Sequence, residues 1–74
     1  MKAGDVLHLT RAASPQFARP IYLRLIRIHT DLDTYDGWIW LDGYQLDKKG
    51  DAVDRRELYV LTAGVRLLGP APRT

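Results

Sequence analysis

The sequence contains no cysteine, only one phenylalanine and only one methionine. The lack of cysteine excludes disulfide bonds, thiolate metal ligands and a cysteine nucleophile, and it is typical of a reducing compartment. No hydrophobic run approaches the length of a membrane-spanning helix, and the N-terminal segment, which holds Asp5 and His8, lacks the apolar stretch of a signal peptide. We therefore expect a cytoplasmic protein with no membrane attachment.

The length of 74 residues leaves room for one small hydrophobic core. The composition, 46% hydrophobic and 27% charged, is that of a folded chain and not of a disordered one. The sequence ends in Gly69-Pro70-Ala71-Pro72-Arg73-Thr74, a composition typical of a frayed terminus. We expect a single small domain over residues 1–68, followed by a flexible tail over residues 69–74.

Charge is distributed unevenly along the chain. Residues 1–30 carry a net charge of +4, residues 31–54 carry −5 and residues 55–74 carry +3, which gives the formal net charge of +2. This total is too small to indicate nucleic-acid binding without other evidence. The segregation predicts a domain with distinct basic and acidic regions.

Alternation of apolar and polar residues predicts five short strands. In residues 5–10, for example, Leu7 and Leu9 share one face. The other strands are expected over residues 21–30, 38–46 with an interruption at Gly43, 58–61 and 65–68. Asp36-Gly37 predicts the hairpin turn between the second and third strands, and residues 47–50 predict the next turn.

The second strand changes phase near Leu25-Ile26, which predicts a β-bulge. A bulge there would turn one set of side chains inward (Leu23, Leu25 and Ile28) and another outward (Arg24, Arg27 and His29). Because a bulge bends its strand, the second strand is expected to curve sharply.

Two connections are less regular. Ser14-Pro15 is a helix-start pattern, so one short helical turn near Ser14–Phe17 is compatible with the sequence, and Phe17 is expected to fold inward as an anchor over one end of the core. Residues 52–56 are left open between an irregular link and a second helical turn. Together these features predict an all-β fold, a strongly bent five-stranded antiparallel barrel of the SH3-like type, and that architecture hosts many functions.

The inventory of catalytic groups is small, with two histidines, His8 and His29, and a few hydroxyl groups in turns. We therefore expect no enzymatic activity, no catalytic residues and no cofactor. The acidic segment that holds Asp31 and Asp33 follows His29, but as a calcium loop it would place Tyr35 fifth and Asp42 twelfth. No metal site is predicted.

The phase of Trp38-Ile39-Trp40-Leu41 permits two arrangements. If Ile39 and Leu41 pack in the core, Trp38 and Trp40 project outward as an aromatic pair and provide a binding surface. If the tryptophans fill the core instead, the two aliphatic residues lie outside and no such surface exists. The sequence leaves both open.

Two binding functions follow from the outward arrangement. The first is nucleic-acid binding, in which guanidinium groups contact phosphates and an indole stacks on a base. The residues expected in this face, for either nucleic acid or a protein partner, are Arg24, Arg27, Trp38, Trp40, Arg55, Arg56 and Arg66. The second is a protein-interaction module that binds a basic or proline-rich peptide, or a second copy of the chain, through the tryptophans and tyrosines. The tyrosines in question are Tyr22, Tyr35, Tyr44 and Tyr59.

Residues 40–47 read Trp-Leu-Asp-Gly-Tyr-Gln-Leu-Asp and are followed by Ala52-Val53 and Arg55-Arg56. Over residues 35–61 this pattern resembles short uncharacterised proteins of high-GC bacteria. The resemblance implies that the motif is the core of a family, and it carries no function, cofactor or partner with it.

Overall fold

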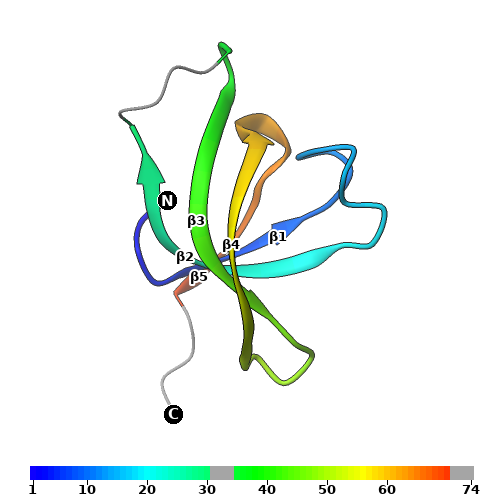
Figure 1. Cartoon of the computed structure of the whole chain (residues 1–74), viewed down its shortest axis with the longest axis vertical. Helices are drawn as coiled ribbons and strands as arrows, with labels where there is room; N and C mark the ends of the chain where they lie inside the picture. Colours follow the sequence, from blue (N-terminus) through cyan, green and yellow to red (C-terminus); the bar gives the residue numbers. More distant parts are fainter. Residues whose placement is uncertain (31–34, 71–74) are drawn as a thin grey trace.

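The computed structural model describes residues 1–30 and 35–70. It contains five strands and one short helical turn in the described part of the chain (Figure 1). In chain order these are β1 (Asp5–Leu9), β2 (Ile21–His29), β3 (Trp38–Leu46), β4 (Ala52–Leu61), the 3-10 turn η1 (Thr62–Gly64) and β5 (Arg66–Pro70). The all-β class predicted from the sequence is confirmed.

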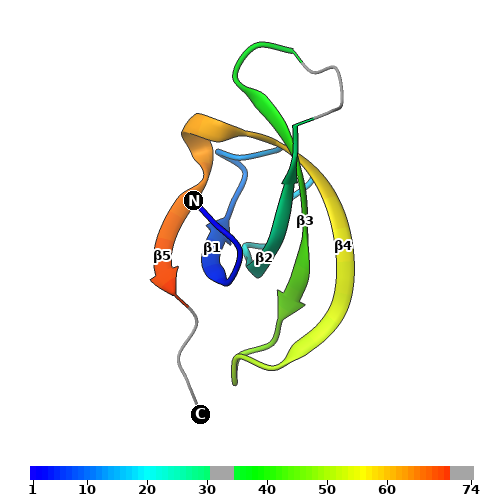
Figure 2. The same cartoon turned by 90° about the vertical axis from the view of Figure 1, so that its left-hand side faces the viewer.

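All five strands belong to one antiparallel sheet with the order β4-β3-β2-β1-β5. Figure 2 shows the strands side by side in this order, with β4 and β5 at the two edges. Among the described residues no pairing joins β4 to β5, so the sheet is open and the SH3-like barrel is not confirmed. The described residues include no helix with the length and apolar character needed to cross a membrane.

The predicted bulge in β2 is confirmed. The pairing of β2 with β3 shifts between Leu25 and Arg27, which leaves Ile26 as the extra residue. Gly43 lies opposite Leu25, next to the bulge. A Cβ atom on Gly43 would come within 2.7 Å of the backbone oxygen of Arg24, so only glycine lets the two strands approach this closely.

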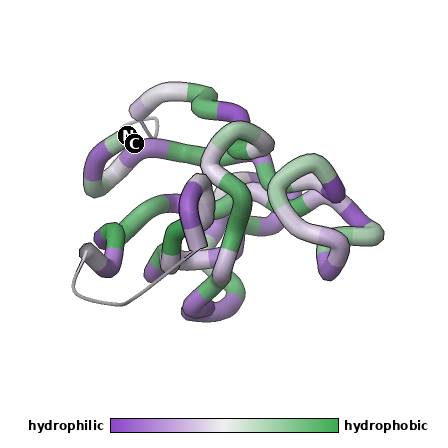
Figure 3. Tube along the Cα trace, turned by 90° about the horizontal axis from the view of Figure 1, so that it is seen from above, coloured by the Kyte–Doolittle hydropathy of each residue, from purple (hydrophilic) through white to green (hydrophobic). Residues whose placement is uncertain are grey.

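The core lies on one face of the bent sheet, called here the inner face. Among the described residues it consists of nine buried side chains from four strands and one loop: Leu7, Leu9, Ala13, Phe17, Leu23, Leu25, Leu41, Leu58 and Val60. The alternation of apolar and polar residues is visible along the strands in Figure 3. Leu7 and Leu9 share the inner face, as predicted, and Ile28 packs against the core after the bulge.

Residues 11–20 cover one end of the core. Phe17 is buried there, so the predicted anchor is confirmed. The segment Ser14–Phe17 forms a single turn, closed by a hydrogen bond from the Phe17 backbone N–H to the Ser14 carbonyl oxygen (3.1 Å), and does not continue into a helix. The Ser14 hydroxyl accepts a hydrogen bond from the Gln16 backbone N–H (3.4 Å), the contact that an N-cap serine makes, but no helix follows.

The end of the chain is more regular than the sequence indicated. Residues 52–56 are neither a link nor a helical turn but the first half of β4, which pairs with β3 from Trp38 to Leu46. The 3-10 turn lies instead at Thr62–Gly64. Strand β5 extends through Gly69 and Pro70, the first two residues of the expected tail, and the remaining tail residues lie outside the described part of the chain.

Candidate functional site

The candidate site lies on the outer face of the sheet, the side opposite the core. The phase of β3 defines this face, because Leu41 is in the core and Ile39 packs against it. Trp38 and Trp40 alternate with these residues and therefore lie on the outer face, half-buried. The structure thus selects the outward phase, but the indole rings are partly covered by neighbouring side chains.

Tyr59 of β4 provides that cover. It lies directly opposite Trp40 in the pairing of β3 with β4. Its ring stacks on Trp38, with centroids 5.1 Å apart and planes at 23°, and tilts against Trp40, with centroids 5.0 Å apart and planes at 35°. The three rings, called here the indole cluster, support one another by aromatic contacts, which hold the two tryptophans in defined positions. The Tyr59 hydroxyl also accepts a hydrogen bond from the backbone N–H of Tyr35 (3.0 Å).

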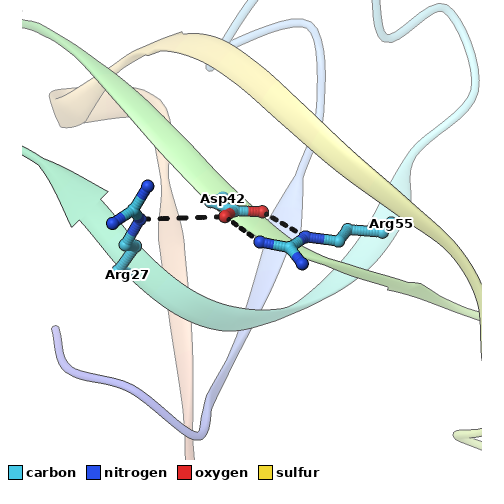
Figure 4. A network of polar contacts seen from close by, with 3 residues as sticks. All are labelled: Arg27, Asp42 and Arg55. Carbon is cyan, nitrogen blue, oxygen red and sulfur yellow. Dashed lines mark hydrogen bonds and ion pairs between the residues drawn. The ribbon is translucent and has the colours of Figure 1, made fainter.

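Next to the indole cluster lies a carboxylate held between two arginines (Figure 4). Asp42 of β3 accepts two hydrogen bonds from Arg55 of β4, from Nε to Oδ1 (3.1 Å) and from Nη2 to Oδ2 (2.7 Å). Arg27 of β2 approaches from the other side, with Nε 3.8 Å from Oδ2. The Asp42 side chain is only 1% exposed, whereas those of Arg27 and Arg55 are 65% and 59% exposed. The carboxylate therefore lies just beneath the surface, and the guanidinium groups lie above it.

This arrangement lowers the pKa of Asp42. The main cause is the hydrogen bonding from Arg55, to which the charges of Arg55, Arg27 and His29 add, while burial of the carboxyl group acts in the opposite direction. The same contact raises the pKa of Arg55. Both shifts favour the charged forms, so the Asp42 carboxylate and the Arg55 guanidinium are both charged at neutral pH.

The acid sensitivity of folding should reflect this depressed pKa. Because the pKa of Asp42 is lower in the folded than in the unfolded protein, its stabilisation is present above the unfolded-state pKa, near 4, and is lost as pH falls through the folded-state pKa. We expect the urea concentration at the midpoint of unfolding to decrease as the pH is lowered below about 4. In Asp42→Asn this decrease with pH should be smaller. The same dependence in Asp42→Asn as in the unmodified protein would show that other carboxyl groups control acid unfolding.

Further along the outer face, two more contacts combine aromatic and basic side chains. The Arg24 guanidinium carbon lies 5.6 Å from the centroid of the Tyr44 ring, within cation–π range. His8 stacks on Tyr22, with centroids 4.9 Å apart and planes at 18°. Arg66 of β5 pairs with His8, so its side chain is on the same face of the sheet. The outer face thus carries aromatic and arginine side chains from the indole cluster to β5.

The structure brings most of the predicted binding residues to this face and separates one from it. Six of the seven lie on the outer face: Arg24, Arg27, Trp38, Trp40, Arg55 and Arg66. Arg56 pairs with Gly43, which belongs to the inner-face positions, and its Nη1 donates a hydrogen bond to Gln45 Oε1 (3.0 Å). Arg56 therefore cannot contact a ligand that lies on the outer face together with the other arginines.

Two of the described residues of this face were not predicted as part of it: Asp42 and Glu57. Glu57 reaches this face through cross-strand pairing, in which it lies opposite Asp42, as Tyr59 lies opposite Trp40. The alternation of β3 was a signal for Asp42, since it is two residues after Trp40. Asp31 and Asp33, the acidic residues that follow His29 in the sequence, lie outside the described residues.

Comparison of the chain with protein-family models, with curated proteins and with solved structures gave no significant match.

Proposed function

We propose that this small β domain is a non-enzymatic binding module that binds single-stranded nucleic acid on its outer face. The observation that carries the proposal is the position of the indole cluster beside the exposed guanidinium groups of Arg27 and Arg55. Proteins that bind single strands combine aromatic side chains, on which bases stack, with basic groups that follow the backbone. Here both kinds of side chain project from three adjacent strands of one sheet, β2, β3 and β4.

The charges of the outer face support the same ligand. Of the residues that the structure describes, four arginines lie on it, Arg24, Arg27, Arg55 and Arg66, against the carboxylates of Asp42 and Glu57. Because Asp42 is buried beneath its arginines, a ligand would meet the basic groups first. Arginine also suits phosphate, since its planar group donates paired hydrogen bonds.

The ordering of the arginines by Asp42 adds a second reason. Arg55 is held by two hydrogen bonds to a carboxylate that the sheet itself positions. Its guanidinium group therefore loses less side-chain entropy when a phosphate binds to its remaining N–H groups. Asp42 serves in this proposal as a positioning residue.

The proposal is tested by titrating a fluorescently labelled single-stranded oligonucleotide with the protein at several salt concentrations. We expect binding that weakens as salt rises, with a slope of log K against log salt of roughly −2 to −3 if three or four phosphates are neutralised. Trp40→Ala should lower the affinity by about tenfold or more, because base stacking on an aromatic side chain is lost. Trp38→Ala should act in the same direction.

Arg27 and Arg56 provide a matched control pair. Arg27→Gln removes a positive charge from the outer face, whereas Arg56→Gln removes the same charge from the other side of the sheet. We expect the first to weaken binding and to flatten the salt dependence, and the second to do neither. Absence of binding at low salt, or equal effects of the two substitutions, would reject the proposed face. Circular dichroism of each variant confirms that the fold is retained.

A protein partner is the second candidate, and the open edges of the sheet favour it. Edge strands present unpaired backbone groups to other chains, and β4 and β5 carry the exposed apolar residues Val53, Leu67 and Leu68. A peptide or a second copy of the chain could add a strand at such an edge. Sedimentation analysis as a function of concentration tests self-association, with Val53→Lys and Leu67→Lys expected to abolish it.

A further inference from the structure

The outer face brings together three side chains that are far apart in the sequence and that have donor atoms suited to a metal ion. His29 of β2, Asp42 of β3 and Glu57 of β4 each offer one ligand atom, and these atoms all lie within 4.8 Å of one another. They meet because β3 lies between the other two strands and Asp42 pairs directly with Glu57. One imidazole nitrogen and two carboxylate oxygens form a donor set typical of zinc and related divalent ions.

A second, independent observation concerns His29. Its Nε2 atom is buried and has no hydrogen-bond partner among the described residues. An unsatisfied polar atom away from water is costly, and such atoms are rare in native proteins. A bound cation would satisfy this nitrogen if it is the ligating one, since the lone pair of neutral imidazole is a metal ligand.

Asp42 can serve such an ion without losing Arg55. The two hydrogen bonds from Arg55 occupy one acceptor site on each carboxylate oxygen, whereas an ionised carboxylate has about four such sites. Carboxylates that ligate metals are commonly oriented by further hydrogen bonds, which is the relation that Arg55 has to Asp42. Glu57 is exposed, so its side chain can move to complete the site.

We propose that His29, Asp42 and Glu57 bind one divalent transition-metal ion, with Zn²⁺ as the best match. Ligands of a tetrahedral Zn²⁺ ion lie roughly 3.3 Å apart, which follows from bonds of about 2.0 Å. The three donors must therefore close in, and the exposed Glu57 supplies most of that movement. The three side chains leave a fourth coordination position for water. This site does not depend on nucleic-acid binding.

The charges around the site set its strength. The carboxylates of Asp42 and Glu57 contribute two negative charges, and Arg27 and Arg55 contribute two positive charges within the same cluster. The net charge around the cation is therefore close to zero and adds little to its binding free energy. The cation is bound mainly through its bonds to the three ligand atoms. We expect an affinity in the micromolar range, which is well below that of structural zinc sites.

Isothermal titration calorimetry of the tag-free, chelator-treated protein with ZnCl₂ at pH 7.5 tests the proposal. We expect one equivalent to bind, with the affinity lowered by at least about tenfold in both His29→Gln and Glu57→Gln. The chain has only two histidines, so His8→Gln is the matched control and should bind as the unmodified protein does. Substitution with Co²⁺ gives a second readout, since visible absorption of tetrahedral intensity should appear in the unmodified protein and in His8→Gln only.

Three outcomes overturn the proposal. The first is the absence of Zn²⁺ binding at concentrations up to a millimolar. The second is an equal loss of affinity in His8→Gln and His29→Gln, which would show dispersed binding to histidines. The third is binding unchanged in Glu57→Gln, a variant that should fold normally because Glu57 is exposed. Circular dichroism and the urea midpoint of each variant in the presence of chelator separate loss of the ion from loss of the fold.

Discussion

Replacing Gly64 with alanine should destabilise the fold more than a change of one methyl group ordinarily does. The added Cβ atom would overlap the carbonyl group of Ala12, which is backbone and cannot rotate away. That backbone is fixed by its neighbours, since the Ala13 carbonyl oxygen accepts a hydrogen bond from the Leu61 N–H (2.7 Å). We expect a loss of about 3 kcal/mol, a large part of the roughly 4 to 11 kcal/mol typical for a domain of this length.

Urea unfolding followed by tryptophan fluorescence measures this effect. Gly50→Ala is the appropriate control, because a Cβ atom added to Gly50 would have no atom within 4 Å. Its cost would come only from the positive φ of Gly50, +88°. That variant should lose only about 1 to 2 kcal/mol, the cost of a left-handed backbone for alanine. If Gly64→Ala unfolded at the same urea concentration as Gly50→Ala, the close contact between residues 11–20 and η1 would not exist in solution.

The strands that were predicted well are those whose side chains alternate because one face is buried. The bulge in β2 followed from the break in phase at Leu25-Ile26, since only an extra residue keeps Leu23, Leu25 and Ile28 on the core side. The first half of β4 has no such pattern, because its residues 52–56 extend beyond the core and are mostly exposed. Its conformation comes from pairing with β3, a tertiary interaction that overrides the low strand propensity of Asp54.

The candidate site, too, was predictable where it depends on alternation within a strand and not where it depends on pairing between strands. The residue types and the two alternatives for β3 could be read from the sequence, because alternation forces Trp38 and Trp40 onto one face. The choice between the alternatives required the core, in which Leu41 is buried and Ile39 packs against it. Cross-strand neighbours were beyond sequence analysis, since a shift of one residue in the pairing of β3 with β4 would remove both Tyr59 and Glu57 from the face.

Replacement of Phe17 with alanine is expected to have the largest effect on stability. Phe17 is 3% exposed and comes from residues 11–20, which lie outside the strands and contribute Ala13 and Phe17 to the core. Removing a buried phenylalanine typically costs 3 to 5 kcal/mol, because its transfer free energy is lost and a cavity is left. The indole cluster behaves differently, since Trp38 and Trp40 are half-buried on the other face and their removal leaves no enclosed cavity.

Thermal unfolding of Phe17→Ala, Phe17→Leu and Trp38→Ala distinguishes these roles. Phe17→Leu keeps an apolar side chain in the core and should lose clearly less stability than Phe17→Ala. Trp38→Ala should lose less than Phe17→Ala while losing affinity for the oligonucleotide. If Trp38→Ala unfolded as readily as Phe17→Ala, the tryptophans would be supporting the fold and not presenting a surface. The proposed binding face requires the opposite, because a residue that meets a ligand must be removable without loss of the sheet that carries it.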